Sequence, residues 1–226
     1  MALSESALAG VLGPMVVLAQ SGILKSVAGK PWPAPVKTDE PEKAPILNPV
    51  DALKTFTMPA GYHLELAAAE PLIKDPILME FDADGRLWVM EMHGFAINEK
   101  IENSFEPIND LVILEDTNND GQYDKRTVFM DKLIMPRAFK ILDKGCALVG
   151  EPPNLWKACD TNGDGQSDTK ELIDKTFGAQ GIVEHGANGL FWGMDNTIVV
   201  SEHTWNVNFD SATGKFSTVP SLRRGQ

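Results

Sequence analysis

The segment Leu78-Met-Glu-Phe-Asp-Ala-Asp-Gly-Arg-Leu-Trp-Val-Met-Glu91 joins two short apolar runs through an Asp-Ala-Asp-Gly turn. Aspartate and glycine tolerate the backbone conformations of tight turns, so this pattern predicts a β-hairpin. The same order of apolar run, turn, apolar run and glutamate recurs twice, in residues 139–151 and 190–202. The closing glutamates, Glu91, Glu151 and Glu202, are 60 and 51 residues apart. This spacing predicts an internal repeat.

A second hairpin is expected after each of these segments, in residues 111–129, 154–168 and 207–216. Two hairpins make a four-stranded unit, and its length is typical of a propeller blade. We therefore expect an all-β fold, namely about three blades of a six-bladed type of β-propeller. Because the last residues, 221–226, contain no stop signal, we interpret the chain as a partial ring.

The composition narrows the function classes. The chain has 226 residues and is 43% hydrophobic, which is enough to bury a core. Its net charge of −12 argues against nucleic-acid binding and against a polybasic membrane anchor, and it suits divalent cations. No apolar run approaches the roughly 18 residues of a transmembrane helix.

Three regions are expected along the chain. Residues 1–22 resemble a secretory leader because 8–19 form a short apolar run, although residues 1–6 carry no positive charge. The alternative is a disordered N-terminal segment, or a start codon assigned too far upstream. Residues 23–57 are predicted to be a Pro-rich linker with one helical turn near its end, and residues 58–226 the incomplete propeller. A leader predicts a periplasmic or otherwise extracytoplasmic protein, with membrane association left open.

Two acidic loops follow the spacing of calcium-binding loops, in which carboxylate and amide oxygens alternate around a glycine. The predicted calcium ligands are Asp160, Asn162, Asp164, Gln166, Asp168 and Glu171 in one loop, and Asp116, Asn118, Asp120, Gln122 and Asp124 in the other. The alternative is a pair of solvated hairpin turns, since Asp, Asn and Gly favour turns anyway. Strands flank the first loop, which argues against a helix–loop–helix sensor, whereas residues 170–175 are compatible with a short helix after the second.

Three histidines, His93, His185 and His203, stand at the ends of predicted strands, where equivalent positions of a propeller meet on one face. A neutral imidazole is a suitable general base. Hydrogen-bonded loop histidines are the alternative, and His63 is interpreted as structural. We expect the repeated glutamates to have a structural role and to hydrogen-bond neighbouring blades, and the alternatives are that they line the channel or cap a metal. Trp88, Trp156 and Trp192 are expected to pack between blades, whereas an exposed Trp205 would suit sugar stacking.

The two cysteines, Cys146 and Cys159, exclude a zinc ribbon and a covalent c-type haem, because no Cys-x-x-Cys is present. A turn at Glu151-Pro-Pro would bring them near one another across two strands. The open alternatives are a cross-strand disulfide and two small buried apolar side chains.

Several stretches resemble the propeller domain of the membrane-bound dehydrogenase-like proteins of planctomycetes, distant kin of the soluble quinoprotein glucose and sorbosone dehydrogenases. They are residues 59–71, 81–92, 114–121, 150–156 and 185–196, and the resemblance covers about residues 58–226. Full members of that family continue into further blades, often followed by a helical repeat and a cytochrome c module.

The resemblance implies oxidation of a sugar or other alcohol, with His185 as the base, Asn188 beside it, and pyrroloquinoline quinone as hydride acceptor. We assign His93 and His203 to cofactor binding, and a cytochrome c is the implied electron acceptor. The quinone's basic ligands would lie mainly in further blades, so this chain alone is expected to be inactive. The alternative function is a non-catalytic, calcium-stabilised propeller that binds carbohydrate or protein.

Overall fold

The computed structural model describes residues 46–95, 104–143, 145–179, 186–210 and 212–221, together with two short strands nearer the N-terminus. The chain divides into two compact units, 1–47 and 48–226. In the first unit, β1 (Ser26–Val27) pairs with β2 (Lys30–Pro31) in antiparallel fashion. The predicted leader and most of the predicted linker lie outside the described residues. No helix in the described part of the chain is long and apolar enough to cross a membrane.

The second unit begins with the helical turn that the sequence predicts, α2 (Pro49–Leu53). The Asn48 side chain accepts a hydrogen bond from the backbone N–H of Asp51 at 2.9 Å, and Pro49 occupies the first helical position. Both features favour a helix start, because Asn satisfies an otherwise unpaired N–H and Pro needs none. The compact unit therefore starts at Asn48, upstream of the expected propeller boundary at residue 58.

The described residues of this unit form three four-stranded antiparallel sheets, which we call blades 1, 2 and 3. Blade 1 contains β3 (Pro76–Phe81), β4 (Leu87–Glu91), β5 (Asn109–Glu115) and β6 (Lys125–Leu133). Blade 2 contains β7 (Ala138–Ile141), β8 (Cys146–Glu151), β9 (Asn154–Cys159) and β10 (Thr169–Asp174). Blade 3 contains β11 (Asn188–Trp192), β12 (Thr197–Ser201), β13 (Trp205–Asp210) and β14 (Lys215–Pro220). All six predicted hairpins are confirmed.

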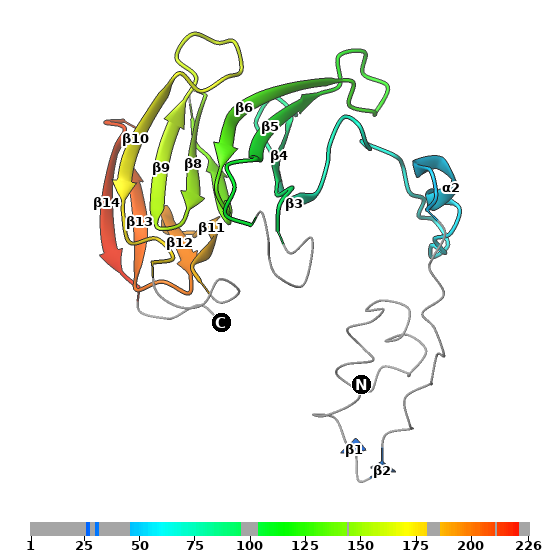
Figure 1. The fold of residues 1–226 in the computed structure, drawn as a ribbon, viewed down its shortest axis with the longest axis horizontal. Helices are drawn as coiled ribbons and strands as arrows, with labels where there is room; N and C mark the ends of the chain where they lie inside the picture. The colour runs from blue at the N-terminus through cyan, green and yellow to red at the C-terminus, as the bar shows by residue number, and fades with distance from the viewer. Residues whose placement is uncertain are drawn as a thin grey trace. The chain divides into compact units, whose positions relative to one another are not determined.

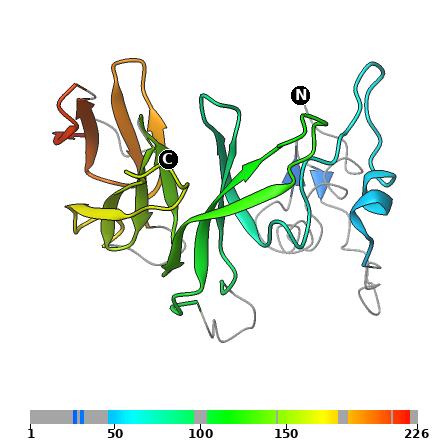
Figure 2. The ribbon, with the colours of Figure 1, turned by 90° about the horizontal axis from the view of Figure 1, so that it is seen from above.

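The blades stand side by side, as Figures 1 and 2 show. Within each blade the strands follow chain order, and the first strands lie closest together, because β7 contacts both β3 and β11. This is the arrangement of adjacent β-propeller blades, with the first strand of each blade innermost. The predicted all-β, partial-propeller fold class is confirmed.

Apolar side chains fill the spaces between the blades. Trp88 and Trp156 pack in the cluster between blades 1 and 2, and Trp192 packs in the cluster between blades 2 and 3, as predicted. Trp205 also packs against the second cluster, so it is not the exposed stacking platform considered above. Gly150 is needed here, since a β-carbon at this position would lie 2.5 Å from the Phe177 ring.

The outward face of blade 1 is covered by the chain that precedes it. Ala68, Leu72 and Ile73 pack against apolar side chains of β4 and β5. The Tyr123 backbone N–H donates to the Ala67 carbonyl at 2.8 Å, which fixes the segment beside the sheet. The segment that leads into β3 is therefore held against blade 1.

Two local predictions are resolved by strand pairing. Residues 170–174 belong to strand β10 rather than to a short helix, because they complete the ladder of β9 and thereby satisfy their backbone groups. Cys146 and Cys159 are directly opposite in β8 and β9 and form a disulfide, so the cross-strand alternative is confirmed.

Candidate functional site

Functional side chains gather at the two ends of the sheets. The acidic-loop end carries the loops between the third and fourth strands of blades 1 and 2, residues 116–124 and 160–168. The histidine end is the opposite one, where β4, β8 and β12 finish. Antiparallel pairing separates these ends, because each strand reverses the chain direction.

The first acidic loop is folded around its own side-chain oxygens. Asp116 accepts the backbone N–H groups of Asp120 and Gly121 at 3.2 and 2.9 Å. Asp120 also donates its N–H to Asn118 and accepts that of Gln122, at 2.9 and 2.8 Å. These three side chains are the predicted ligands at positions 1, 3 and 5.

Three hydrogen bonds of this network recur in the second loop, with every residue shifted by 44 positions. Gly165 donates to Asp160 at 2.8 Å, Asp164 donates to Asn162 at 2.9 Å, and Gln166 donates to Asp164 at 2.8 Å. Burial alone would raise the pKa of Asp160, but backbone N–H groups, those of Gly165 and Gly163 foremost, outweigh it and lower that pKa. The carboxylate is therefore held in its charged form.

The remaining predicted ligands have identifiable places. Asp124 accepts the backbone N–H of Thr117 at 3.1 Å and its hydroxyl at 2.9 Å. Asp168 accepts the backbone N–H of Thr161 at 2.9 Å and its hydroxyl at 2.8 Å. Glu171 lies within β10 opposite Lys157. Among the described residues, the Asp and Glu side chains of these loops do not form a group of three with ligand atoms within 4.8 Å.

The second loop also touches blade 1. The Ser167 backbone N–H donates to the Phe129 carbonyl on β6 at 2.8 Å. A β-carbon on Gly165 would lie 3.0 Å from the Thr127 side chain, and its φ is +86°. Glycine there permits both the turn and the close approach.

At the histidine end, Glu91 of β4 is bonded both to β6 and to the segment that precedes β3. It is 1% exposed, and its Oε1 accepts the backbone N–H of Lys74, just before β3, at 2.8 Å. Its Oε2 accepts a hydrogen bond from Arg126 Nη2 on β6 at 2.7 Å. We call this arrangement of glutamate, upstream N–H and fourth-strand cation the latch.

Blade 2 contains the same latch. Glu151 Oε1 accepts the Ile134 backbone N–H at 2.7 Å, and Lys170 on β10 lies 3.4 Å from Oε2. Both N–H groups lie 17 residues before their glutamate. Trp156 Nε1 adds a hydrogen bond to Glu151 Oε2 at 2.8 Å. The expected structural role therefore fits Glu91 and Glu151, but their partners lie in their own blade or in the segment before it rather than in a neighbouring blade. Glu202 is exposed.

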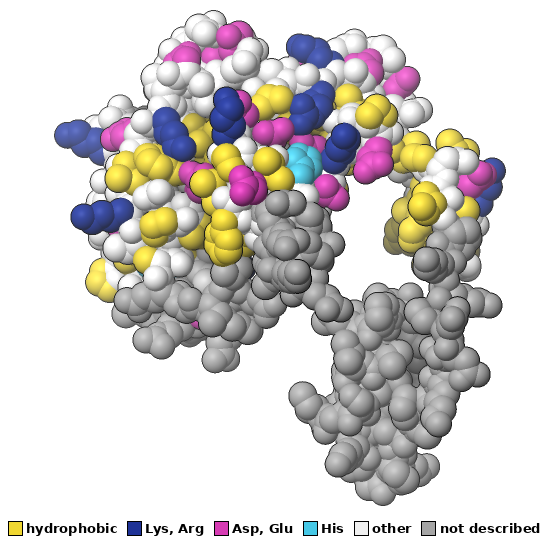
Figure 3. Space-filling view, viewed as in Figure 1, with side chains coloured by type: hydrophobic (Ala, Val, Ile, Leu, Met, Phe, Trp, Pro, Cys, Tyr) yellow, Lys and Arg dark blue, Asp and Glu magenta, His cyan; other side chains and the backbone are white. Residues whose placement is uncertain are grey.

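His93 lies beside the blade 1 latch, between two carboxylates. Its Nδ1 is 3.3 Å from Asp75 Oδ2, and its Nε2 is 3.6 Å from Glu91 Oε2. Asp110 completes the group, 3.4 Å from Arg126 Nη2. Figure 3 shows a histidine among acidic and basic side chains over this blade. We call Asp75, Glu91, His93, Asp110 and Arg126 the charged cluster.

His203 lies at the corresponding end of blade 3. Its ring contacts Phe177 and Trp205, and its Nε2 is buried without a hydrogen-bond partner in the described part of the chain. Burial lowers its pKa, and the opposing effect of Asp174 is smaller. Asn188 starts β11 opposite Ser201, so it shares this end, and its side chain donates to the Gly186 carbonyl. His185 lies outside the described residues.

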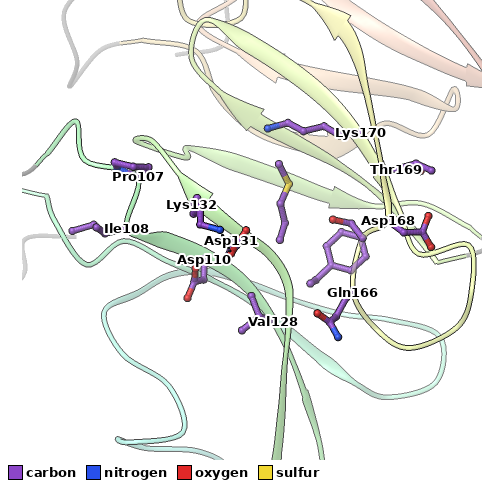
Figure 4. A pocket seen from close by; sticks show the side chains of 13 residues that line it. Pro107, Ile108, Asp110, Val128, Asp131, Lys132, Gln166, Asp168, Thr169 and Lys170 are labelled. Atoms are coloured by element: carbon purple, nitrogen blue, oxygen red, sulfur yellow. Dashed lines mark ion pairs between the residues drawn. The ribbon is translucent and has the colours of Figure 1, made fainter.

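A groove of about 640 Å³ opens between β6 of blade 1 and the second acidic loop with β10 of blade 2. Figure 4 shows Pro107 and Ile108 on one side and Gln166, Asp168 and Lys170 on the other. Asp110 lines this groove and also belongs to the charged cluster.

Sequence reasoning did not identify Asp75, Asp110 or Arg126 as site residues. Asp75 stands directly before Pro76, a position that marks a strand start but no chemistry. Arg126 follows an acidic loop, and nothing near it in sequence indicates a partner 35 residues earlier. Only the lateral order of the strands brings them together.

Comparisons with known proteins give one family and a remote structural likeness. A family model described as "Domain of unknown function (DUF7133)" matches residues 48–223. No curated protein matches the sequence. An X-ray structure described as that of a "putative gluconolactonase" is similar with a TM-score of 0.41 and 17% identity, over 70% of this chain. The matched part spans 52%, about half, of that protein's chain.

Proposed function

Because the chain belongs to the DUF7133 family, whose description states no activity, we propose a function from its own residues: a calcium-stabilised propeller domain that binds a sugar or other alcohol. The single observation that carries the calcium part is the shared fold of the two acidic loops. Their oxygens at positions 1, 3 and 5 make matching hydrogen bonds in both loops.

The donor chemistry of the loops suits calcium. Ca²⁺ takes six to eight oxygen ligands, and the side-chain carboxylates and amides of these loops would supply several of them. The residues that would hold the ion are Asp116, Asn118 and Asp120 in one loop and Asp160, Asn162 and Asp164 in the other. The bound ion would stiffen each hairpin rather than trigger a helix rearrangement, since both loops join strands.

Calcium titration with matched variants tests this part. We expect Ca²⁺ to raise the melting temperature of the full chain, and Asp160→Asn with Asp164→Asn to abolish the contribution of the second loop. Asp116→Asn with Asp120→Asn should do the same for the first. Asp84→Asn is the control, because Asp84 is an exposed residue of another acidic turn. Equal calcium responses in all variants would overturn the proposal.

The binding face would be the histidine end, where polar side chains of blades 1 and 3 stand at equivalent strand ends. The adjoining groove offers carboxylate, amide, hydroxyl and ammonium groups, which match the hydroxyls of a sugar. The disulfide supports an extracytoplasmic location, because such bonds persist in oxidising compartments.

Alcohol oxidation, implied by the family resemblance, stays a prediction. Pyrroloquinoline quinone carries three carboxylates and needs free cations, but the described cations of the latches are paired: Arg126 with Glu91 and Asp110, and Lys170 with Glu151. The cations of the two latches are therefore not free to bind this quinone.

Quinone binding and ligand binding can be measured separately. Fluorescence titration of the calcium-loaded chain with the quinone tests the dehydrogenase hypothesis. Quinone binding that His185→Ala and His203→Ala weaken would support it. Sugar binding by calorimetry with no quinone binding would instead support the non-catalytic alternative, a carbohydrate-binding propeller.

A further inference from the structure

The charged cluster of blade 1 contains more than its latch needs. Blade 2 makes the same latch with Glu151, Ile134 N–H and Lys170, yet the residue two positions after its glutamate is Pro153 rather than a histidine. The residue paired with that glutamate is Asn154, whereas Glu91 pairs with Asp110. His93 and Asp110 are therefore additions to a network that works without them.

These additions create a set of metal-ligand atoms. One ligand atom each from Glu91, His93 and Asp110 lies within 4.8 Å of the others, and these three form the one such group in the described ranges. Glu91 Oε1 is occupied by the Lys74 N–H, which leaves Oε2 directed to His93 Nε2 at 3.6 Å. From this geometry we infer a divalent-cation site formed by Glu91, His93 and Asp110, separate from the calcium loops.

A supporting shell is also present. Asp75 Oδ2 lies 3.3 Å from His93 Nδ1, so Asp75 can accept a hydrogen bond from Nδ1–H. The lone pair of Nε2 then faces Glu91. Metal-binding histidines are usually oriented by such a carboxylate. Lys74 and Asp75 are adjacent, so one short segment before β3 positions both the glutamate and the histidine.

Arg126 supplies the positive charge while no cation is bound. Its Nη2 lies 2.7 Å from Glu91 Oε2 and 3.4 Å from Asp110 Oδ2, so it is paired with both carboxylates. The cluster holds the carboxylates of Asp75, Glu91 and Asp110 and a single guanidinium, so negative charge remains in excess. A divalent cation would take this place, and Arg126, partly exposed on β6, would turn toward solvent.

The donor set selects the ion class. One imidazole nitrogen with two carboxylates suits Zn²⁺ or a neighbouring first-row ion better than Ca²⁺, which prefers oxygen ligands alone. Three protein ligands leave a coordination position for water or a ligand oxygen. The groove beside Asp110 would give a hydroxyl-bearing ligand access to that position.

Zinc titration of the full chain in millimolar Ca²⁺ tests the site, because calcium keeps the acidic loops occupied. We expect one zinc per chain by calorimetry. His93→Asn and Asp110→Asn should each weaken zinc binding about 100-fold or more, and Asp75→Asn about tenfold. Arg126→Gln should tighten zinc binding, because it removes the competing cation.

Two controls separate this site from incidental binding. His63→Asn should leave the zinc affinity unchanged, since His63 pairs with Glu65 on an exposed surface. With Co²⁺ as the probe, visible absorption bands of the bound ion should be lost in His93→Asn while the circular dichroism spectrum stays native. Absence of zinc binding, or binding that survives both His93→Asn and Asp110→Asn, would overturn the inference whether or not the calcium loops bind.

Discussion

Blades 1 and 2 have the same hairpins, the same kind of acidic loop and the same glutamate latch, but they are fastened differently at the acidic-loop end. In blade 2, Cys146 and Cys159 close the second and third strands covalently. The first turn of blade 1 is closed by a hydrogen bond from the Asp82 N–H to the Arg86 carbonyl. The equivalent bond in blade 2 runs from the Leu142 N–H to the Cys146 carbonyl. Asp82 accepts hydrogen bonds from Arg86 and Trp88.

The comparison shows which parts of a blade are exchangeable. The buried carboxylate of Asp82 ties its turn to β4 within the first hairpin, whereas the disulfide at the equivalent turn of blade 2 joins the second strand to the third. In both blades the latch satisfies a backbone N–H of the segment that leads into the first strand. Removal of these fastenings one at a time tests the comparison.

The disulfide of blade 2 should have the largest effect. It joins residues 13 apart in sequence, and loss of such a link costs about 3 kcal/mol through the entropy of the unfolded chain. Cys146→Ala with Cys159→Ala should therefore lower the free energy of unfolding by that amount in urea titration. Added reductant should destabilise the wild type and leave the double variant unchanged, and the opposite result would remove the disulfide from the comparison.

The two latches should differ in strength. Glu91→Ala leaves the Lys74 N–H and Arg126 without their partner and should cost about 3 kcal/mol. Glu151→Ala should cost about 2 kcal/mol, since Glu151 is 9% exposed and its cation is farther away. The exposed Glu202→Ala should stay within about 0.5 kcal/mol. Equal losses at all three positions would contradict the latch.

The carboxylate network of blade 1 should make folding sensitive to acid. Burial would raise the pKa of Asp82, but hydrogen bonds from Trp88 and Arg86 outweigh it and lower that pKa. A lowered carboxyl pKa adds stability that is present above pH 3.8 and is lost as the pH falls through the folded-state value. Asp82→Asn should cost about 1.5 kcal/mol at neutral pH and flatten this acid limb in urea titrations. An unchanged pH profile would exclude Asp82 as its source.

Blade 3 should show the smallest effect, through His203. Burial holds the pKa of His203 below 6.5, so the unfolded chain binds the proton more readily. Stability should therefore fall by less than about 1 kcal/mol as the pH drops below about 6.5. His203→Gln should remove this pH dependence of the melting temperature between about pH 7 and 5.5. A pH dependence that persists in this variant would show that another group causes it.

The sequence by itself determined the all-β class, the six hairpins and the two acidic loops, because each depends on residues that are close along the chain. Turn residues flanked by apolar runs define a hairpin locally, and the repeat of 44 residues between Asp116 and Asp160 shows in the letters alone.

Only the tertiary structure decided the charged cluster, the inter-blade groove and the strand at 169–174. Arg126 reaches Glu91 across the intervening strand β5, and Asp75 meets His93 from a separate strand start. These contacts depend on the lateral order and twist of the strands, which local sequence does not encode. Burial then requires each charge to find a partner, and the fold, rather than the spacing in sequence, determines which partner is within reach.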